Sequence, residues 1–306
     1  MKLNNTKLAF LAAVLLTHTL AAQPPEQLHK SEILTPVNSF TSGVEGPAVD
    51  AKGNLYAVNF EKQGTIGQVQ PNGKATLWLT LPEGSIANGI RFTSKGQMLL
   101  ADYTGHNVWL VNPATKKLKL LAHEPTMNQP NDLAIDNRDR VYASDPNWKE
   151  GTGKLWRIDP NGSVHLLDTL GTANGVEVSP DNKKLYVNES VQRKVWVYDL
   201  APDGSVKNKQ LFYEFPDYGM DGMRCDQQGN LYITRFGKGA VVMLAPDGTK
   251  LVEISLIGKR PTNIAFGGTD GRTAYVTLQD QGNIEQFRVE FPGREFKTPR
   301  NNPSKK

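Results

Sequence analysis

Cysteine is almost absent from this chain of 306 residues, in which Cys225 is the only one. No intrachain disulfide can form, so a large folded domain has to be held together by its apolar core. Cys225 lies in the strand-like run Gly222-Met-Arg-Cys-Asp, and no histidine is near it in the sequence. This context favours a buried structural thiol over a nucleophile.

Long apolar segments and helical periodicity are also missing. The apolar run Leu8–Leu16 is shorter than the roughly 20 residues of a membrane-spanning helix, and no second run follows it. Two lysines precede the run, and Ala21 and Ala22 offer small residues for cleavage. This arrangement is typical of a secretory signal peptide over residues 1–22. We therefore expect an exported protein, periplasmic or secreted, with no membrane span.

The body of the chain has no large excess of charge of one sign. The formal net charge of +4 comes from the ends, because two lysines lie in the first seven residues and Pro292–Lys306 has five basic residues and one acidic residue. The residues between these ends have a net charge of −2. We therefore expect no nucleic-acid partner. The polar segment 292–306 is predicted to be a flexible basic tail.

The sequence does contain one unit that is repeated six times. The copies begin at residues 46, 89, 132, 175, 222 and 263. Each contains two β-rich runs around a turn of Gly, Asn, Asp and Lys, and most continue with a third and a fourth run. Four strands in about 40–45 residues are typical of a β-propeller blade, whereas a β-helix has shorter repeats and a sandwich does not repeat six times. The sequence predicts an all-β fold, a six-bladed propeller of antiparallel strands over residues 23–291.

The last unit has no fourth run of its own. After Asn283–Glu290 the chain continues into the polar tail, whereas Ser31–Pro36 near the N-terminus resembles the missing strand. We predict that Ser31–Pro36 pairs with the last blade, because this closure removes two free sheet edges.

One position of the repeat has a side-chain oxygen in all six copies. It is the residue just before each inner strand, and the inner strands of a propeller line its channel, so these residues should meet around the axis. They are Glu45, Asn88, Asn131, Asn174, Asp221 and Thr262. Two carboxylates among amide oxygens suit a hard divalent cation such as calcium, and the lack of His and Cys argues against zinc or copper. Without a cation the carboxylates would repel each other, and one would hold a proton.

Turn chemistry is the alternative explanation, since Asn and Asp before Gly serve tight turns. It accounts for Asn88, Asn174 and Asp221, but not for Glu45, nor for Asn131, which has no glycine after it. The second strand of each unit should return to the same end of the channel. We expect its end residues to line the pocket wall, although strand ends are often polar in any case. They are Asn59, Asp102, Asp145, Asn188, Arg235 and the apolar Leu278.

Five motifs at these positions resemble the gluconolactonase / senescence-marker-protein / luciferin-regenerating-enzyme family. The motifs are Glu45-Gly46-Pro47, Pro130-Asn131-Asp132, Asn174-Gly175-Val176, Ser179-Pro180-Asp181 and Asp221-Gly222-Met223. They extend over most of the chain. The resemblance implies a six-bladed propeller that holds calcium or another divalent ion and hydrolyses a lactone or, as in some members, an organophosphate.

The resemblance also assigns roles to residues. Glu45, Asn174 and Asp221 match metal ligands, and Asn131 matches a ligand or near-ligand that also meets the substrate. Asp132 matches an acidic functional residue of many bacterial lactonases. Asp132 is thus our first candidate for the carboxylate that activates water, and Asp221 is the second.

The function expected from the sequence is a hydrolase that opens a small-molecule lactone at one divalent cation. Calcium is the first choice, with magnesium, manganese and zinc as alternatives. Gln129 stands where sugar lactonases often have Arg, so the resemblance leaves the identity of the lactone open. A non-catalytic exported binding protein and a phosphotriester hydrolase remain as alternatives. The chain is expected to be a monomer or a weak homo-oligomer.

Overall fold

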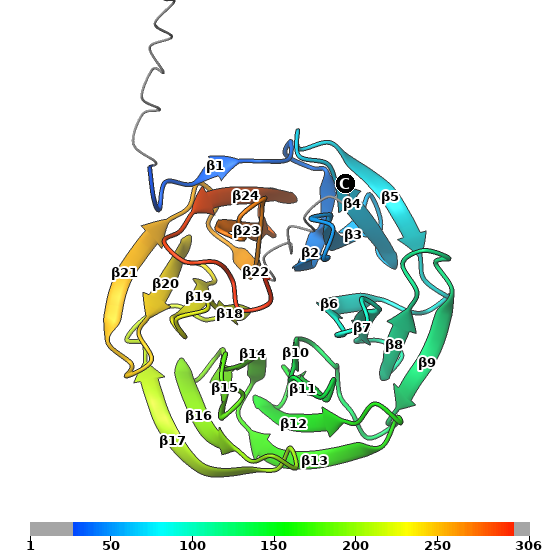
Figure 1. The fold of residues 1–306 in the computed structure, drawn as a ribbon, viewed down its shortest axis with the longest axis vertical. Helices are drawn as coiled ribbons and strands as arrows, with labels where there is room; N and C mark the ends of the chain where they lie inside the picture. Colours follow the sequence, from blue (N-terminus) through cyan, green and yellow to red (C-terminus); the bar gives the residue numbers. More distant parts are fainter. Residues whose placement is uncertain (1–26, 297–306) are drawn as a thin grey trace, which may run out of the picture.

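The computed structural model describes residues 27–296, and the helices and strands assigned within this range are all strands, with no helix among them. Twenty-four strands form six antiparallel four-stranded sheets around one axis (Figure 1). This arrangement confirms the predicted six-bladed propeller. Within residues 27–296 no helix could cross a membrane. The predicted signal peptide, residues 1–22, lies outside the described residues.

The first three blades each run from an inner to an outer strand in chain order. Blade 1 contains β2 (Phe40–Val49), β3 (Leu55–Phe60), β4 (Thr65–Val69) and β5 (Ala75–Thr80). Blade 2 contains β6 (Ala87–Phe92), β7 (Met98–Asp102), β8 (Asn107–Val111) and β9 (Leu118–His123). Blade 3 contains β10 (Leu133–Ile135), β11 (Val141–Asn147), β12 (Thr152–Ile158) and β13 (Val164–Leu170).

Blades 4 and 5 follow the same order, and blade 6 takes its outer strand from the N-terminus. Blade 4 contains β14 (Ala173–Val178), β15 (Lys184–Glu189), β16 (Lys194–Leu200) and β17 (Val206–Glu214). Blade 5 contains β18 (Met223–Cys225), β19 (Leu231–Arg235), β20 (Ala240–Leu244) and β21 (Lys250–Ser255). Blade 6 contains β22 (Pro261–Gly267), β23 (Thr273–Leu278), β24 (Asn283–Arg288) and β1 (Glu32–Ile33).

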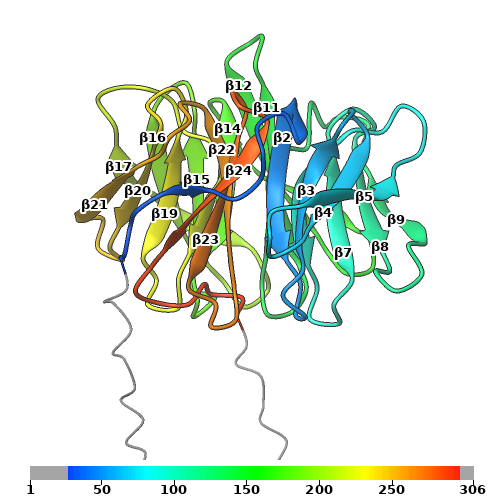
Figure 2. The same ribbon diagram turned by 90° about the horizontal axis from the view of Figure 1, so that it is seen from above.

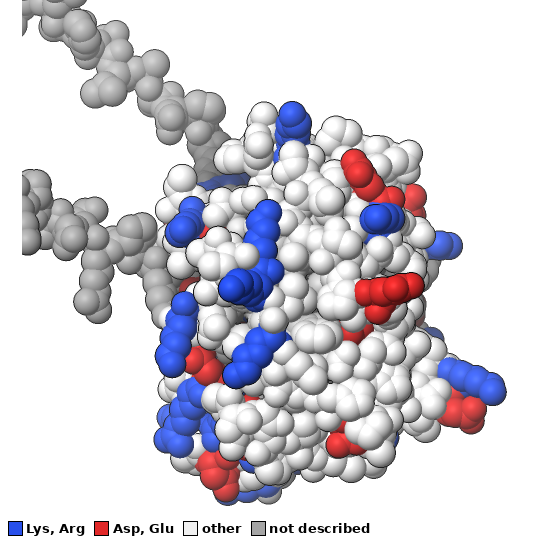
Figure 3. All heavy atoms as spheres, turned by 90° about the vertical axis from the view of Figure 1, so that its right-hand side faces the viewer, with Lys and Arg blue, Asp and Glu red and all other residues white. Residues whose placement is uncertain are grey.

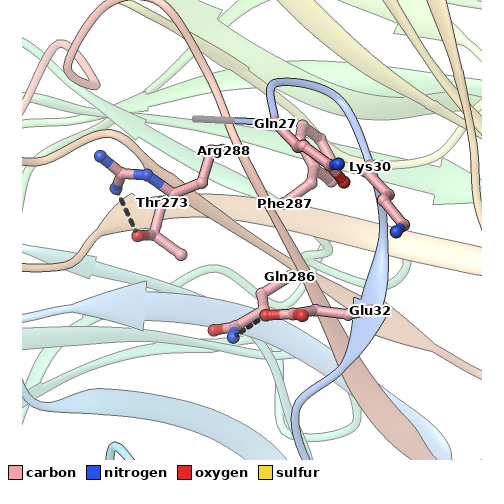
Figure 4. A pocket seen from close by; sticks show the side chains of 7 residues that line it. All are labelled: Gln27, Lys30, Glu32, Thr273, Gln286, Phe287 and Arg288. Atoms are coloured by element: carbon pink, nitrogen blue, oxygen red, sulfur yellow. Dashed lines mark hydrogen bonds between the residues drawn. The ribbon is translucent and has the colours of Figure 1, made fainter. Parts of the chain in front are cut away.

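The closure of the ring occurs as predicted. Strand β1 pairs antiparallel with β24, with Glu32 opposite Gln286. A cavity of about 210 Å³ lies at this seam, and the Gln286 amide donates to the Glu32 carboxylate at 2.7 Å in its wall (Figure 4). Thr35, just after β1, accepts a hydrogen bond from the backbone N–H of Ile284 at 2.9 Å. The N-terminal segment is therefore attached to blade 6 by backbone and side-chain hydrogen bonds.

The core lies between neighbouring blades, because each sheet buries both of its faces. One apolar cluster combines Tyr56, Val58 and Ile66 of blade 1 with Ile90 and Leu100 of blade 2. The other clusters likewise contain residues from two adjacent blades. On the outer side that faces the viewer in Figure 3, basic and acidic side chains are interspersed among uncharged ones.

Three blades use the same device in the turn between their first two strands. An aspartate accepts hydrogen bonds from two turn N–H groups and from the hydroxyl of a tyrosine six residues later. The pairs are Asp50 with Tyr56, Asp136 with Tyr142, and Asp226 with Tyr232. The repeated turn signal of the sequence thus has a physical basis in Asx-type turns. Cys225 ends β18 and is buried, and this burial raises the pKa of its thiol.

The segment 292–306 was expected to be a flexible tail, but its first five residues belong to the fold. We call residues 292–296 the C-terminal strap. The Pro292 carbonyl accepts a hydrogen bond from Gln227 N, Gly293 N donates to the Gly271 carbonyl and Arg294 N donates to that of Cys225. In Figure 2 the strap runs along the lower edge of the propeller, where the inner strands end. Residues 297–306 lie outside the described part of the chain.

Candidate metal centre

Three of the predicted ligands, from blades 1, 4 and 5, are in contact at the axis. The carboxyl group of Asp221 lies next to the carboxyl group of Glu45 and the amide of Asn174. Glu45 lies within β2, Asn174 lies within β14 and Asp221 comes shortly before β18. Residues that are far apart in the sequence are therefore brought together at the start of the inner strands, as the repeat register predicts.

The two acidic side chains are strongly perturbed by this environment. Burial, followed by the charge of Asp132, raises the pKa of Glu45 from its ordinary value of 4.5 to about 7. Burial and the charge of Glu45 raise the pKa of Asp221 well above its usual range. A metal-free pair of this kind retains a proton, because two desolvated negative charges in contact repel each other. This agrees with the expectation from the sequence.

Two amide oxygens of the ring have no hydrogen-bond partner among the described residues. They are Oδ1 of Asn131 and Oδ1 of Asn174, and both atoms are buried. A buried acceptor without a partner costs free energy. Together with the carboxyl groups of Glu45 and Asp221, these atoms fit the hard oxygen ligands that calcium prefers. Residues 27–296 contain no group of three or more His, Cys, Asp or Glu that could hold a metal ion, so any such site depends on the amides.

Backbone contacts hold the ring residues in place. Asn131 N donates to the Ser144 carbonyl at 2.8 Å, and the Asn188 amide donates to the Asp221 carbonyl at 2.6 Å. Gly46 has a positive φ of 54°, and a Cβ added there would lie 2.1 Å from the Asn88 carbonyl oxygen. Only glycine allows this close approach of blades 1 and 2 directly after the predicted ligand Glu45.

Two residues predicted for the pocket wall, Asp102 and Asp145, instead accept hydrogen bonds from neighbouring strands and loops of their own blades. Asp102 accepts hydrogen bonds from Trp109 Nε1 at 3.0 Å and from the Ser85 hydroxyl at 2.7 Å. Asp145 accepts from Trp156 Nε1 at 2.9 Å and from the backbone N–H of Gln129 at 2.6 Å. Both aspartates are fully buried. These contacts fix the loops that lead to the ring, and a direct substrate contact stays a prediction.

The other residues predicted at strand ends are also buried. The Asn59 amide donates to the Gly43 carbonyl at 2.6 Å. Arg235 forms an ion pair with Asp217 at 2.9 Å, and its guanidinium lies 3.6 Å from the centre of the Phe215 ring. Asn188 is buried too, but its Oδ1 has no hydrogen-bond partner among the described residues. Among the residues predicted at strand ends, Asn188 therefore has an acceptor atom left for a ligand.

Asn88 and Gln129 are partly exposed beside the ring. The Asn88 amide donates to the Asn131 carbonyl at 3.5 Å. Thr262 was the sixth ring candidate, but its hydroxyl donates to the Val44 carbonyl at 2.8 Å and so connects blade 6 to blade 1. Asn263, the next residue, contacts Glu45 instead. The sequence interpretation missed Asn263 because the sixth repeat is the loosest copy.

A buried cluster of charges lies beside and beyond the ring. Arg91, Glu177 and Arg224 occupy the third position of their repeats, on inner strands β6, β14 and β18. Asp132 Oδ1 lies 3.4 Å from Arg91 Nη1, and Asp132 Oδ2 lies 3.2 Å from Arg224 Nη1. Arg294 of the C-terminal strap lies 3.0 Å from Glu177. The shared repeat position is the signal that could have predicted this cluster.

Asp132 is therefore placed differently from what a water-activating base requires. It is fully buried, and two guanidinium groups face its two oxygens. Its two oxygens also accept the backbone N–H groups of Leu133 and Val176, so neither is free to receive a proton from water. No observation tests the catalytic role of Asp132 directly, so that role stays a prediction, but its contacts are those of a structural ion pair.

A closed all-β propeller with an oxygen-lined axial site defines the class of this protein. The chain belongs to the SMP-30/Gluconolactonase/LRE-like family, whose model matches residues 43–280. The matched region covers the ring from Glu45 to Asp221, most of blade 1 and all of blades 2 to 5, which confirms the resemblance seen in the motifs.

Individual relatives agree with this membership. The chain is 27% identical over 301 residues to a gluconolactonase of Zymomonas mobilis, covering 86% of this chain and 83% of that protein. It is 24% identical over 296 residues to a diisopropyl-fluorophosphatase of Loligo vulgaris, covering 86% and 94%. A calcium-binding regucalcin structure from Agrobacterium tumefaciens has a TM-score of 0.74 at 21% identity, covering 87% and 98%. The gluconolactonase and the diisopropyl-fluorophosphatase both bear the names of hydrolases.

Proposed function

We propose that this protein is a metal-dependent hydrolase that opens a small-molecule lactone at a divalent cation, with calcium as the first choice. One observation carries the proposal: the unpartnered buried Oδ1 atoms of Asn131 and Asn174 lie in the same ring as the carboxyl groups of Glu45 and Asp221. The gluconolactonase relative supports the reaction, and the calcium-binding regucalcin structure supports the metal.

The cation, when bound, supplies a positive charge that stabilises the oxyanion of the opening lactone. Glu45, Asn131, Asn174 and Asp221 would hold it. Asp221 would accept the proton of the attacking water, because its carboxyl group lies in the ring and, unlike that of Asp132, has no ion pair with an arginine among the described residues. Asp132 would instead keep Arg91 and Arg224 in place.

The test begins with protein purified without chelator, whose metal content is measured by mass spectrometry. Hydrolysis of aldonolactones and of apolar γ- and δ-lactones is then followed with a pH indicator, with added calcium and with EDTA. We expect turnover of at least one lactone, its loss in EDTA, and its loss in Asp221→Asn. Asp247→Asn is the matched control, since Asp247 is an exposed residue of the β20–β21 turn.

Three results would contradict the proposal in different ways. Turnover that is unaffected by EDTA would remove the metal from the reaction. Equal turnover by Asp221→Asn and the native protein would remove Asp221 from it. Calcium binding without turnover of any lactone would favour the alternative of an exported binding protein.

A second candidate reaction is phosphotriester hydrolysis at the same ring. The similarity to a diisopropyl-fluorophosphatase over 86% of this chain favours it. Fluoride release from a phosphorofluoridate, measured beside the lactone panel, distinguishes the two reactions. A catalytic efficiency higher for the phosphorus substrate than for every lactone would reverse their order.

We also propose that the mature protein is exported as a monomer or a weak homo-oligomer. The pattern of residues 1–22 supports export. Cell fractionation with N-terminal sequencing would give a mature chain that starts next to Ala21 or Ala22. Light scattering at increasing protein concentration would measure its mass. An uncleaved cytoplasmic chain would contradict the first expectation, and a concentration-independent oligomer would contradict the second.

A further inference from the structure

Asn263 is a buried polar residue at a position of the repeat where four other blades have glycine. The equivalent residues are Gly46, Gly89, Asp132, Gly175 and Gly222. At this repeat position only Asn263 and Asp132 have a side chain. They come from blades 6 and 3, which lie on opposite sides of the axis (Figure 1). Asp132 is neutralised by arginines, whereas Asn263 has no charged partner of that kind among the residues described.

The position of the Asn263 side chain is well determined by its neighbours. Its side-chain atoms would lie 2.0–2.4 Å from a Cβ added at Gly222, so the amide occupies the space that this glycine leaves free. Gly222 directly follows Asp221. The Asn263 amide also contacts the carboxyl group of Glu45. It therefore lies against Glu45 and beside Gly222, the residue after Asp221, between blades 5 and 1.

The two ends of the amide have different environments. Oδ1 accepts a hydrogen bond from the backbone N–H of Ile264 at 2.9 Å. Nδ2 is buried and lies near the Glu45 carboxyl group, but it has no hydrogen-bond partner of normal geometry in the described part of the chain. A buried donor without an acceptor is costly, and a carboxylate is the acceptor that rewards it most. The contacts therefore direct an N–H group toward the site of Glu45.

We propose that Asn263 is a positioning residue that holds the ionised Glu45 carboxylate in the orientation required for binding the divalent cation. This inference rests on the proposed function, because it assumes that Glu45 is a ligand. Metal-bound carboxylates are themselves hydrogen-bonded, and loss of such a partner typically costs about 10–100-fold in metal affinity. Asn263 itself is not a ligand here, because its Oδ1 is used by the Ile264 N–H.

The test measures calcium binding by isothermal titration calorimetry, with calcium alone as the probe. Asn263→Leu keeps the side-chain volume and removes the donor. We expect its Kd for calcium to rise by about 10–100-fold. Asn283→Leu is the matched control, because Asn283 is an equally buried asparagine of the same blade whose amide has no partner among the described residues, and it lies on β24, two strands away from β22.

A purely structural role for Asn263 would lower the melting temperature and leave Kd unchanged. An unchanged Kd in Asn263→Leu, or an equal rise in Asn283→Leu, would overturn the inference. If Asn263→Leu does not fold, Asn263→Ser removes the amide without adding volume, and the same rise in Kd is expected. Absence of calcium, magnesium and manganese binding by the native protein would instead contradict the proposed function, so the two failures are distinguishable.

Discussion

Glu45 and Asp221 come from blades 1 and 5, yet their carboxyl groups lie next to each other in the centre of the propeller. A proton between them relieves the repulsion in the absence of metal, and a divalent cation would replace that proton. Metal binding and protonation at this pair therefore compete, and several predictions about pH and substitution depend on that competition.

The free energy of unfolding of the metal-free protein should fall as pH rises from 4.5 to about 7. Between pH 4.5 and about 7 the folded chain holds a proton on Glu45 that the unfolded chain has released. The folded state thus binds more protons, so the free energy of unfolding decreases across this window, by on the order of 3 kcal/mol. Thermal unfolding in EDTA at pH 5, 6, 7 and 8 measures it. Glu45→Gln should make the slope smaller and leave the part that comes from burial of Asp221, and an equal slope in that variant would refute this origin.

Asp221→Asn and Asp132→Asn should have opposite effects on the metal-free protein. Asp221→Asn removes one member of a repelling pair, so it should raise the melting temperature in EDTA while it abolishes calcium binding. Asp132→Asn leaves Arg91 and Arg224 buried without their shared counter-charge, which should cost about 3–5 kcal/mol. Denaturant titrations of both variants at pH 7 test this contrast. A stable Asp132→Asn protein without activity would restore Asp132 as a catalytic candidate.

Removal of the C-terminal strap should destabilise the propeller. A chain that ends at residue 291 loses the hydrogen bond from Arg294 to Glu177 at 3.0 Å and leaves that carboxylate without one of its cations. Loss of a hydrogen bond to a charged group costs on the order of 2 kcal/mol. The control ends after Phe296 and keeps all strap contacts. Equal melting temperatures of the two chains would show that the strap adds nothing to stability.

The surface ion pair of Arg288 and Asp270 in blade 6 should contribute little to the free energy of unfolding. The two hydrogen bonds from Arg288 lower the pKa of Asp270 from 3.8 to about 2. Stability from this pair is present above pH 3.8 and is lost as pH falls through about 2. Because Asp270 is 43% exposed, Asp270→Asn should cost no more than about 1 kcal/mol at pH 7. Urea titrations at pH 7 and pH 2.5 should show a difference that shrinks with acid, and a constant difference would contradict this explanation.

The sequence predicted the blades well because each strand pair recurs with the same turn chemistry. It also predicted the contact of Glu45 with Asp221, since equivalent positions of a closed repeat must meet at one axis. It failed at Thr262 and Asn263, where the loose sixth copy does not decide which of two adjacent polar residues faces the site.

The charged cluster was missed for another reason. Arg91, Glu177 and Arg224 share one repeat position, but an arginine in a strand gives no local sign that it is buried. The burial of these side chains depends on partners from other blades and on Arg294. The polar composition of the tail had led us to expect Arg294 in solvent. Long-range ion pairs of this kind leave little trace in a single sequence.

The C-terminal strap has a consequence for the passage of small molecules along the central channel. It joins Ile135 of blade 3, Glu177 of blade 4, Cys225 of blade 5 and Gly271 of blade 6 at the ends of the inner strands away from the ring. Because the strap lies across these strand ends, we expect the substrate of the proposed reaction to enter and leave at the ring end of the channel. The proposed lactone and the hydroxy acid made from it would then occupy the same ring, so the hydroxy acid should inhibit competitively against the lactone.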